Sequence, residues 1–504
     1  MLKSSLTPIF STFPAKPNYP RLLFRAINAN LNTAPTVRQN ASPNIFTTTQ
    51  LAPTSAYIHL PFCRKRCYYC DFPIVALGSH SPTQTNDDDD PRISNYIQLL
   101  LREINASKVN FKSHQPLETV FFGGGTPSLV PPRLVSSILD LLRVKFGVTS
   151  DAEISMEMDP GTFDFRKMDD LMALGVNRVS LGVQAFQEEL LKACGRAHGV
   201  KEVYEAIEMV KSCGVENWSS DLISSLPNQT PQMWEESLRL IIEAQPNHVS
   251  VYDLQVEQGT KFGTLYTPGE FPLPSDVQSA GFYRMASRML SDAGYNHYEI
   301  SSYCRDGFEC KHNFTYWKNK PFYGFGLGSA SYVNGMRFSR PKKMRGYIDF
   351  VQSLENGTAD YTGDTNMDVR DLASDVVMLS LRTARGLDLK SFRCAFGNSF
   401  VASLCEAYKP YVESGHVLCL NEQRTVLTAD EYNAILLDEN NIGQGLAYIR
   451  LSDPDGFLLS NELISTAFGV ISPRSLSFKC QLLLWFVLHL GYCCNIDRLV
   501  NRRL

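Results

Sequence analysis

The sequence predicts an α/β fold, in which crossover helices wrap a parallel sheet, followed by a smaller and mainly helical domain. Two observations predict it. Runs rich in β-branched and aromatic residues alternate with helical patterns from residue 57 to about residue 254, as expected of consecutive β/α units. The chain of 504 residues is long enough for two or three domains around one large core.

Residues 1–54 come first and are expected to lie outside the folded domains. They contain no Asp or Glu, and the first acidic residue of the chain is Asp71. A basic, hydroxyl-rich leader of this kind is typical of an organelle transit peptide and cannot bury enough apolar surface to fold alone. The basic turn at 21–25 favours a mitochondrion, whereas the Ser and Thr content favours a chloroplast. An ordinary disordered tail is the alternative.

A loop with three cysteines follows the first expected strand, 57–60. Cys63, Cys67 and Cys70 have the spacing C-x3-C-x2-C, so three thiolates can converge on one metal centre. They suffice for three irons of a [4Fe–4S] cube, whose fourth iron is then open to a small chelating molecule. A zinc site completed by His59 or His80, and buried cysteines without a metal, are the alternatives.

Five further strands and four helices complete the alternation. The strands are expected at 119–122, 153–157, 179–184, 218–223 and 249–254, and the helices at 131–146, 165–174, 200–213 and 233–244. With the first strand they make six β/α units. Ligands of such folds bind at the carboxyl ends of the strands, so the polar residues there are candidate ligands.

The cysteine loop resembles that of the radical S-adenosylmethionine (SAM) proteins. The resemblance is carried by Tyr57-Ile58-His59-Leu60-Pro61-Phe62-Cys63 and is strongest to the branch that contains oxygen-independent coproporphyrinogen III oxidase and the haem chaperone HemW. It covers residues 56 to about 463. It implies a partial, open (β/α)6 barrel that holds a [4Fe–4S] cluster on the three cysteines, with SAM beside it.

The glycine run after the second strand is the first predicted contact for SAM. Gly124, Gly125 and Thr126 belong to Gly-Gly-Gly-Thr-Pro-Ser, and glycines permit the close backbone approach that can grip the methionyl amino group. A glycine run alone is often only a turn. One β/α unit after the cysteine loop, however, it is a pairing that radical SAM proteins share.

Four polar residues at or near later strands are further predicted contacts: Glu157, Gln184, Arg196 and Asp221. Carboxylates and amides suit the ribose hydroxyls and the ammonium group, and Arg suits the carboxylate. Taken singly, each is more often a surface or helix-capping residue. Each matches a SAM-contacting position of the resembled branch, and Tyr57 matches a SAM-contacting tyrosine.

A second motif follows the barrel. Cys310-Lys311-His312-Asn313-Phe314-Thr315-Tyr316-Trp317 fits the pattern H-N-x-x-Y-W, which is typical of HemW proteins and implicated there in haem handling. An imidazole beside aromatic rings suits the axial position of a haem, which makes His312 the first candidate ligand and Cys310 the second. The alternative is that His312 is a structural, hydrogen-bonding residue.

These observations predict a haem chaperone that binds the cluster, SAM and haem and delivers haem to apoproteins of the respiratory chain. The alternatives are oxygen-independent coproporphyrinogen III oxidase and a radical SAM enzyme with another substrate. Oxidases of the branch typically carry a further cysteine two positions after the third, where this chain has Cys70-Asp71-Phe72. No catalytic residue is assigned. Homodimerisation is plausible for the family.

Composition narrows the possible functions and cell compartments of the protein. The chain has 20% charged and 44% hydrophobic residues and a net charge of -4, which is typical of a globular protein and gives no electrostatic case for nucleic-acid binding. Thirteen cysteines without a signal peptide favour a reducing compartment.

The C-terminal third is expected to form separate parts. The predicted division is 55–290 for the barrel, 291–367 for an extension with the second motif, 368–468 for a mainly helical, winged-helix-like domain, and 469–504 for an apolar tail. Within the third part, a helix is expected at 406–414 and a hairpin from strands at 417–420 and 425–428. The stretch 480–494 is shorter than the roughly 20 residues that span a bilayer, so a packed helix, a membrane-touching segment and an atypical terminus stay open.

Overall fold

The computed structural model describes residues 51–78, 90–108, 115–359, 368–437 and 445–472. Most of the predicted leader, His80 and the stretch 480–494 lie outside these ranges. Among the described residues, no helix combines the length and the apolar character needed to cross a bilayer.

Six parallel strands in chain order form the centre of a nine-stranded sheet, which confirms the predicted α/β fold. They are β1 (Ser55–Leu60), β4 (Leu117–Gly124), β5 (Val148–Met158), β6 (Arg178–Gln184), β7 (Trp218–Ser224) and β8 (His248–Asp253). Each expected strand matches one of these to within a few residues, except that β5 begins five residues earlier. Their buried apolar residues form one continuous core with the helices.

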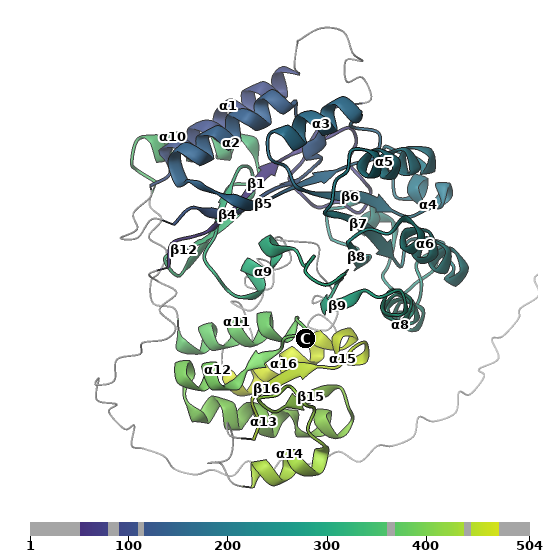
Figure 1. Ribbon diagram of the computed structural model, residues 1–504, viewed down its shortest axis with the longest axis vertical. Helices are drawn as coiled ribbons and strands as arrows, with labels where there is room; N and C mark the ends of the chain where they lie inside the picture. The colour runs from purple at the N-terminus through teal and green to yellow at the C-terminus, as the bar shows by residue number, and fades with distance from the viewer. Residues whose placement is uncertain (1–50, 79–89, 109–114, 360–367, 438–444, 473–504) are drawn as a thin grey trace, which may run out of the picture. The chain divides into compact units, whose positions relative to one another are not determined.

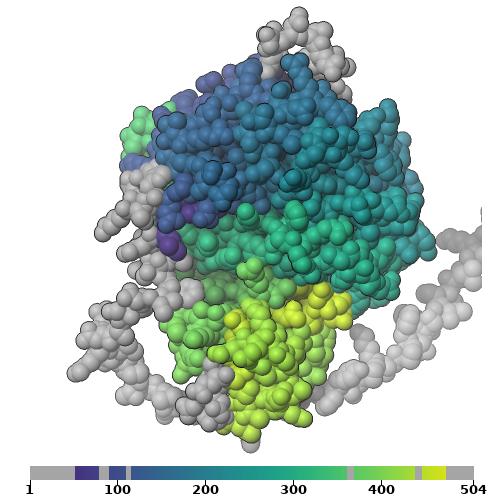
Figure 2. All heavy atoms as spheres, in the orientation of Figure 1, coloured from purple at the N-terminus to yellow at the C-terminus, as the bar shows by residue number. Residues whose placement is uncertain are grey.

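The crossover helices lie along the outer side of the curved sheet (Figure 1). They are α1 (Pro91–Ala106), α2 (Pro132–Phe146), α3 (Phe165–Ala173), α4 (Glu188–Ala193), α5 (Val200–Ser212) and α6 (Pro231–Ala244). In α2, buried Leu134, Ile138 and Leu142 recur every fourth residue, which gives the helix one apolar face for the sheet. On the face seen in Figure 2, the side chains of this part of the chain form a closed surface.

Three strands that the sequence did not predict extend the sheet at both edges. The edge next to β1 gains β11 (Tyr323–Phe325), which runs parallel to it, and β8 is followed by the antiparallel strands β10 (Ser302–Cys304) and β9 (Asn296–Glu299). All three come from the segment after the barrel, so residues far apart in sequence complete one sheet.

Helix α9 (Lys311–Trp317), which carries the second motif, lies on the inner side of the sheet, opposite the crossover helices (Figure 1). The shorter elements around the barrel are β2 (Phe62–Cys63), β3 (Val75–Ala76), the 3-10 helix η2 (Pro127–Leu129), α7 (Lys261–Leu265), α8 (Asp276–Asp292), β12 (Ala330–Val333), β13 (Met336–Ser339) and α10 (Met344–Glu355). Because α9 lies on the inner side, the second motif covers the inner face of the sheet.

The C-terminal part is mainly helical, as predicted. Its helices are α11 (Val369–Leu381), α12 (Leu389–Phe396), α13 (Asn398–Glu413), α14 (Ala429–Leu436), α15 (Asp455–Leu458) and α16 (Ser460–Ile471). They pack with a three-stranded sheet ordered β14 (Leu387–Asp388), β16 (Tyr448–Leu451) and β15 (Val417–Leu420) around a core of their own.

The hairpin predicted at 417–428 is wrong in its second arm. Strand β15 forms, but residues 425–428 contribute only one bridge, between Val426 and Leu420. Strand β16 pairs along the whole of β15 instead. The reason is burial: Ile449 and Leu451 are fully buried, whereas Val426 is 46% exposed, so β16 adds more apolar surface to the core.

Candidate functional site

One cavity at the carboxyl ends of the barrel strands is lined by all three predicted cluster cysteines. It encloses about 730 Å³, part of which is open to solvent. The loop that carries the cysteines is fixed from within: Arg66 Nη1 donates to the carbonyl oxygens of Cys70 (3.1 Å) and Phe72 (2.9 Å). The thiols are therefore presented to the cavity by an ordered loop. Seven other residues predicted from the sequence line the same cavity: Gly124, Gly125, Thr126, Glu157, Gln184, Arg196 and Asp221.

The glycine run needs glycine for two physical reasons. Gly124 has φ +115°, and a Cβ there would lie 2.5 Å from the His59 ring. A Cβ on Gly125 would lie 2.6 Å from the carbonyl oxygen of Phe62. Both contacts are too short for a side chain, so the backbone can pass directly along the cavity wall. Next to it, Thr126 Oγ1 lies 3.6 Å from Cys63 Sγ and donates to it.

Gln184 ends β6 in the left-handed region, with φ 68°. Its side chain is buried, and its Oε1 atom has no hydrogen-bond partner among the described residues. A strained residue with an unpaired buried oxygen is costly unless a ligand uses it. The geometry therefore supports the sequence prediction that Gln184 faces a polar ligand.

Arg196 joins the cysteine loop to the strand ends. Its Nη1 donates to Cys67 Sγ (3.4 Å) and to the Tyr69 hydroxyl (3.0 Å), and its Nη2 pairs with the Asp159 carboxylate. Desolvation raises the pKa of Asp159, whose side chain is 16% exposed, but Arg196 and His198 outweigh this effect and hold the pKa below the usual value. Asp159 was not predicted as a site residue, although its position two residues after Glu157 places it on the same side of the chain.

These residues fit a [4Fe–4S] cluster and SAM. Three thiols face one cavity, two of them already accept hydrogen bonds, and an unpaired amide oxygen and a close glycine backbone offer polar contacts to a small molecule. Burial raises the pKa of Cys63 to about 12 and that of Cys70 to about 11, so a metal's positive charge is needed to form these thiolates near neutral pH. The described residues contain no group of three or more His, Cys, Asp or Glu side chains arranged to hold a single metal ion, so the fit to the larger cluster rests on the three thiols that line one cavity.

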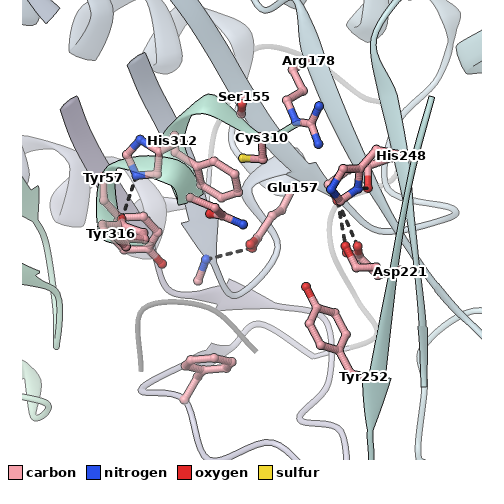
Figure 3. A pocket seen from close by; sticks show the side chains of 17 residues that line it. Tyr57, Ser155, Glu157, Arg178, Asp221, His248, Tyr252, Cys310, His312 and Tyr316 are labelled. Carbon is pink, nitrogen blue, oxygen red and sulfur yellow. Dashed lines mark hydrogen bonds between the residues drawn. The ribbon is translucent and has the colours of Figure 1, made fainter. Parts of the chain in front are cut away.

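A second cavity lies deeper in the barrel and contains the other two predicted residues, Tyr57 and His312 (Figure 3). Four residues line both cavities: Gly124, Glu157, Ser180 and Asp221. The predicted site is therefore two adjoining spaces, one at the cysteines and one under helix α9.

Two carboxyl groups lie where the cavities meet. Burial, and after it the charge of Asp221, raises the pKa of Glu157 to about 8. Burial raises the pKa of Asp221 to about 6, although hydrogen bonds from Ser250 and Ser180 oppose the shift. Glu157 is thus mostly protonated near neutral pH and can donate a hydrogen bond. The backbone N–H of Gly124 donates to its Oε2 atom at 3.0 Å.

His312 stands in the wall of the second cavity with both ring nitrogens engaged. Nδ1 is hydrogen-bonded to Thr119 Oγ1 (2.8 Å) and Nε2 to the Tyr316 hydroxyl (2.7 Å). The side chain is buried, which lowers its pKa to about 3 and keeps it neutral. Haem ligation by His312 therefore requires that Nε2 give up Tyr316. Cys310 lines the same cavity, with its Sγ atom 3.9 Å from Glu153 Oε1.

Several cavity residues were not predicted from the sequence, because they stand neither in a motif nor at the carboxyl end of a strand. They lie two residues before the predicted ones on the same strands: Ser155 before Glu157, and Ser219 before Asp221. Side chains alternate along a strand, so every second residue faces the same side. The same count from Gln184 back along β6 would have found Ser180 and Arg178.

The chain is similar to known proteins along most of its length. A model of the radical SAM superfamily matches residues 57–241, and a model of the HemN C-terminal domain matches residues 367–431. A protein of Synechocystis sp. named heme chaperone HemW is 39% identical over 428 residues, which cover 84% of this chain and 98% of the relative.

The chain belongs to the HemW family of radical SAM proteins. A HemW of Bacillus subtilis is 33% identical and covers 72% of this chain and 92% of its own length. Among solved structures, coproporphyrinogen III oxidase (HemN) of Escherichia coli superposes with a TM-score of 0.66 at 21% identity, over 84% of this HemW-family chain and 92% of HemN. That similarity shows the fold.

Proposed function

We propose that this chain is a haem chaperone that binds a [4Fe–4S] cluster, SAM and haem and delivers haem to haem proteins of the respiratory chain. The observation that carries the proposal is the shared wall between the two cavities. The space proposed for the cluster and SAM adjoins the space walled by the H-N-x-x-Y-W helix. The names of the relatives, heme chaperone HemW, support the same function.

Each part of the first cavity has a role in this proposal. Cys63, Cys67 and Cys70 hold the cluster. The backbone around Gly124 and the free oxygen of Gln184 orient SAM, and Arg196 binds its carboxylate while Asp159 holds the guanidinium in place. When bound, the cluster supplies electron-transfer and Lewis-acid chemistry at its open iron. The protein residues bind and orient these groups.

One observation favours the chaperone over the oxidase. Phe72 stands two positions after the third cysteine, where the oxidases of the branch typically carry another cysteine, and it lines the second cavity. An aromatic ring there offers an apolar surface to a macrocycle but no thiol. The fold alone does not decide between the two functions, since it is shared with HemN.

The proposal is tested by reconstituting the cluster anaerobically and titrating the protein with ferric haem, with coproporphyrinogen III turnover measured in the same samples. We expect a stoichiometric shift of the Soret band without turnover. The Cys70→Ala variant should lose the cluster absorbance, which separates the cluster from haem binding. Turnover without stable haem binding would make the chain an oxidase and overturn the proposal.

We also propose that the leader directs the chain to a mitochondrion or a chloroplast, because its composition is basic and free of acids. Residues 1–54 fused to a fluorescent protein should locate it in one of the two organelles. A fusion that stays in the cytosol, while the same fluorescent protein with a known transit peptide is imported, would refute this.

A further inference from the structure

A buried arginine lies at the deep end of the second cavity. Arg178 begins β6, is 3% exposed, and lines the cavity in register with Ser155 of β5. Its Nη1 donates to Asn217 Oδ1 (2.8 Å) and lies 3.4 Å from the carbonyl oxygen of Phe308. Among the described residues, no carboxylate lies within 4 Å of the guanidinium to form an ion pair with it.

A neighbouring polar group, the hydroxyl of Ser155, has no hydrogen-bond partner among the described residues. Ser155 is 2% exposed, and its Oγ atom makes no hydrogen bond among the described residues. Ser155, Arg178 and Cys310 lie on the same side of the cavity in Figure 3. A buried guanidinium is always charged, and a buried hydroxyl without a partner costs free energy. Together they form a pair of donors at the cavity wall, in which the guanidinium has neutral acceptors but no carboxylate and the hydroxyl has no partner.

The carboxylates around Arg178 act on it without forming a direct ion pair. Glu153 and Asp221 act on Arg178 electrostatically, but from beyond ion-pair distance. Glu157, at the other end of the cavity, is mostly protonated near neutral pH because burial and Asp221 raise its pKa to about 8. A buried arginine is normally paired with a carboxylate, and among the described residues no carboxylate pairs directly with Arg178.

We propose that Arg178 and Ser155 form a carboxylate-binding subsite at the deep end of the barrel, which holds a carboxylate arm of the tetrapyrrole cargo. The guanidinium presents a planar fork of donors that matches a carboxylate. That the cargo is haem, which carries two carboxylate arms, rests on the proposed function. The subsite itself rests on the geometry of Arg178 and Ser155.

The rest of the cavity suits such a ligand. Small side chains on four adjacent strands leave space for an arm to pass along the sheet: Ser155, Ser180, Ser219 and Ser250. Aromatic rings wall the side under helix α9, where Phe121 stacks on His312 at 5.2 Å between ring centroids. An apolar ring system can lie against these rings while one acidic arm reaches the deep end.

The competing explanation is that Arg178 is purely structural and only holds Asn217 and the loop before α9. Ligands that differ only in their carboxylates distinguish the two explanations. Ferric haem and its dimethyl ester have the same macrocycle and iron, but the ester cannot accept a charged bidentate hydrogen bond. Affinities of both are measured by Soret titration for the wild type, Arg178→Gln, Arg178→Lys and Ser155→Ala.

The control variant is Arg382→Gln. Arg382 is also a buried arginine, at 1% exposed, but it belongs to the C-terminal part and donates to Asn461 rather than lining the cavity. It reports what the loss of a buried guanidinium does to the fold alone. Thermal unfolding of each variant accompanies the titrations.

We expect Arg178→Gln to weaken haem binding about tenfold to a hundredfold, the range of a charge-assisted hydrogen bond. Binding of the dimethyl ester should change less than about twofold, the limit we set for no effect. Arg178→Lys should lie between the wild type and Arg178→Gln for haem, because it keeps the charge but not the fork. Ser155→Ala should lose less affinity for haem than Arg178→Gln. Arg382→Gln should leave the affinities for haem and for the ester unchanged.

Equal losses for haem and its ester would overturn the inference and leave Arg178 structural. The same titrations with coproporphyrin III and its tetramethyl ester separate this failure from a failure of the proposed function. Acid-selective, Arg178-dependent binding of coproporphyrin without any haem binding would refute the haem chaperone and support the subsite. A wild type that binds none of the acids would refute both.

Discussion

At the scale of single residues, the cavity walls combine strained backbone with buried polar atoms that lack partners. Gly124 and Gln184 both have positive φ values, and Gln184 also carries an unpaired buried oxygen. The positive φ is strained only for Gln184, since glycine adopts it freely. Such strain persists only where the surrounding structure enforces it, and it concentrates where ligands bind. The residue positions therefore point to the same place as the cysteine spacing does.

Replacing Gly124 by Ala should destabilise the fold. The positive φ costs about 1–3 kcal/mol for a non-glycine residue, and the new Cβ would meet the His59 ring at 2.5 Å. The free energy of unfolding from urea titration measures the loss. Gly281→Ala is the matched control: Gly281 lies exposed inside α8 with nothing within 4 Å of its Cβ position, so it should gain about 0.5–1 kcal/mol. Similar effects in both variants would contradict the prediction.

Tyr316→Phe tests whether His312 ligates haem. The change removes the hydroxyl that engages Nε2 at 2.7 Å and should cost about 1–3 kcal/mol of stability by leaving a buried nitrogen unpaired. If His312 is the axial ligand, haem binds more tightly to Tyr316→Phe, because ligation no longer displaces the hydroxyl. His312→Ala then loses the Soret shift. Unchanged haem spectra in both variants would identify His312 as structural.

At the scale of elements, each strand of the barrel divides its residues between core and cavity. On β7, Trp218 and Leu222 are buried in the apolar core, while Ser219 and Asp221 face the cavity. The outer helices cover one side of the sheet and α9 covers the other. A single helix from late in the chain thereby sets the depth and the aromatic lining of the second cavity.

Helix α11 carries a buried acid that links its stability to pH. Asp375 is 2% exposed and lies 3.9 Å from Arg337 Nε of β13, and burial raises its pKa to about 6. The folded pKa exceeds the unfolded value of about 3.9, so the folded state binds the proton more tightly. This group therefore costs stability as the pH rises from about 4 through 6, in total about 3 kcal/mol.

We predict that Asp375→Asn removes this dependence. The difference in unfolding free energy between the variant and the wild type should be largest above pH 7 and should shrink by about 1–2 kcal/mol on going to pH 5. Urea titrations of both proteins at pH 5 and pH 7.5 measure it. A difference that stays constant, or that grows towards acid pH, would show that Arg337 compensates the charge of Asp375 fully.

At the scale of the whole molecule, the barrel and the C-terminal part are joined by specific contacts. The backbone N–H of Ile300 donates to the Arg382 carbonyl oxygen at 3.0 Å, and Asp453 bonds both His297 Nδ1 (2.8 Å) and Ser287 Oγ (3.0 Å). Residue Ile300 also belongs to the core of the C-terminal part. The segment that completes the barrel sheet is thus also the one that meets this part.

The end of the C-terminal part can be located by truncation. Helix α16 continues to Ile471, which is 1% exposed. A chain that ends at Phe468 loses this side chain and should be about 1.5–3 kcal/mol less stable, the value of one fully buried isoleucine. A chain that ends at Ser472 should unfold like the full chain. Thermal and urea unfolding of both measure this, and equal stability of the two truncated chains would contradict it.

Membrane contact of the tail can be tested with the longer of these two chains. We expect the chain that ends at Ser472 to lose any binding to lipid vesicles that the full chain shows, because residues 473–504 contain the apolar stretch. If the shortened chain still binds the vesicles, another surface of the protein is responsible for the binding.

Local patterns in the sequence were enough to predict the six barrel strands, four crossover helices and the residues that line the first cavity. The alternation of strand and helix patterns depends on side-chain periodicity, which each segment carries by itself, and it predicted six barrel strands and four crossover helices. The cysteine spacing, the glycine run and the polar residues at or near strand ends predicted ten residues that line the first cavity. These residues lie around one cavity because parallel strands bring their carboxyl ends together whatever the details of packing.

Only the tertiary structure decided what depends on contacts between distant segments. It paired β11 with β1, it replaced the second arm of the predicted hairpin by β16, and it placed α9 inside the barrel. It also brought Arg178 and Ser155 together at the deep end of the second cavity. Neither residue stands at the carboxyl end of a strand or in a motif, and the missing partner of Ser155 and the missing carboxylate partner of Arg178 are properties of the packed interior. A one-dimensional pattern carries no information on which buried groups remain unpaired once the core has formed.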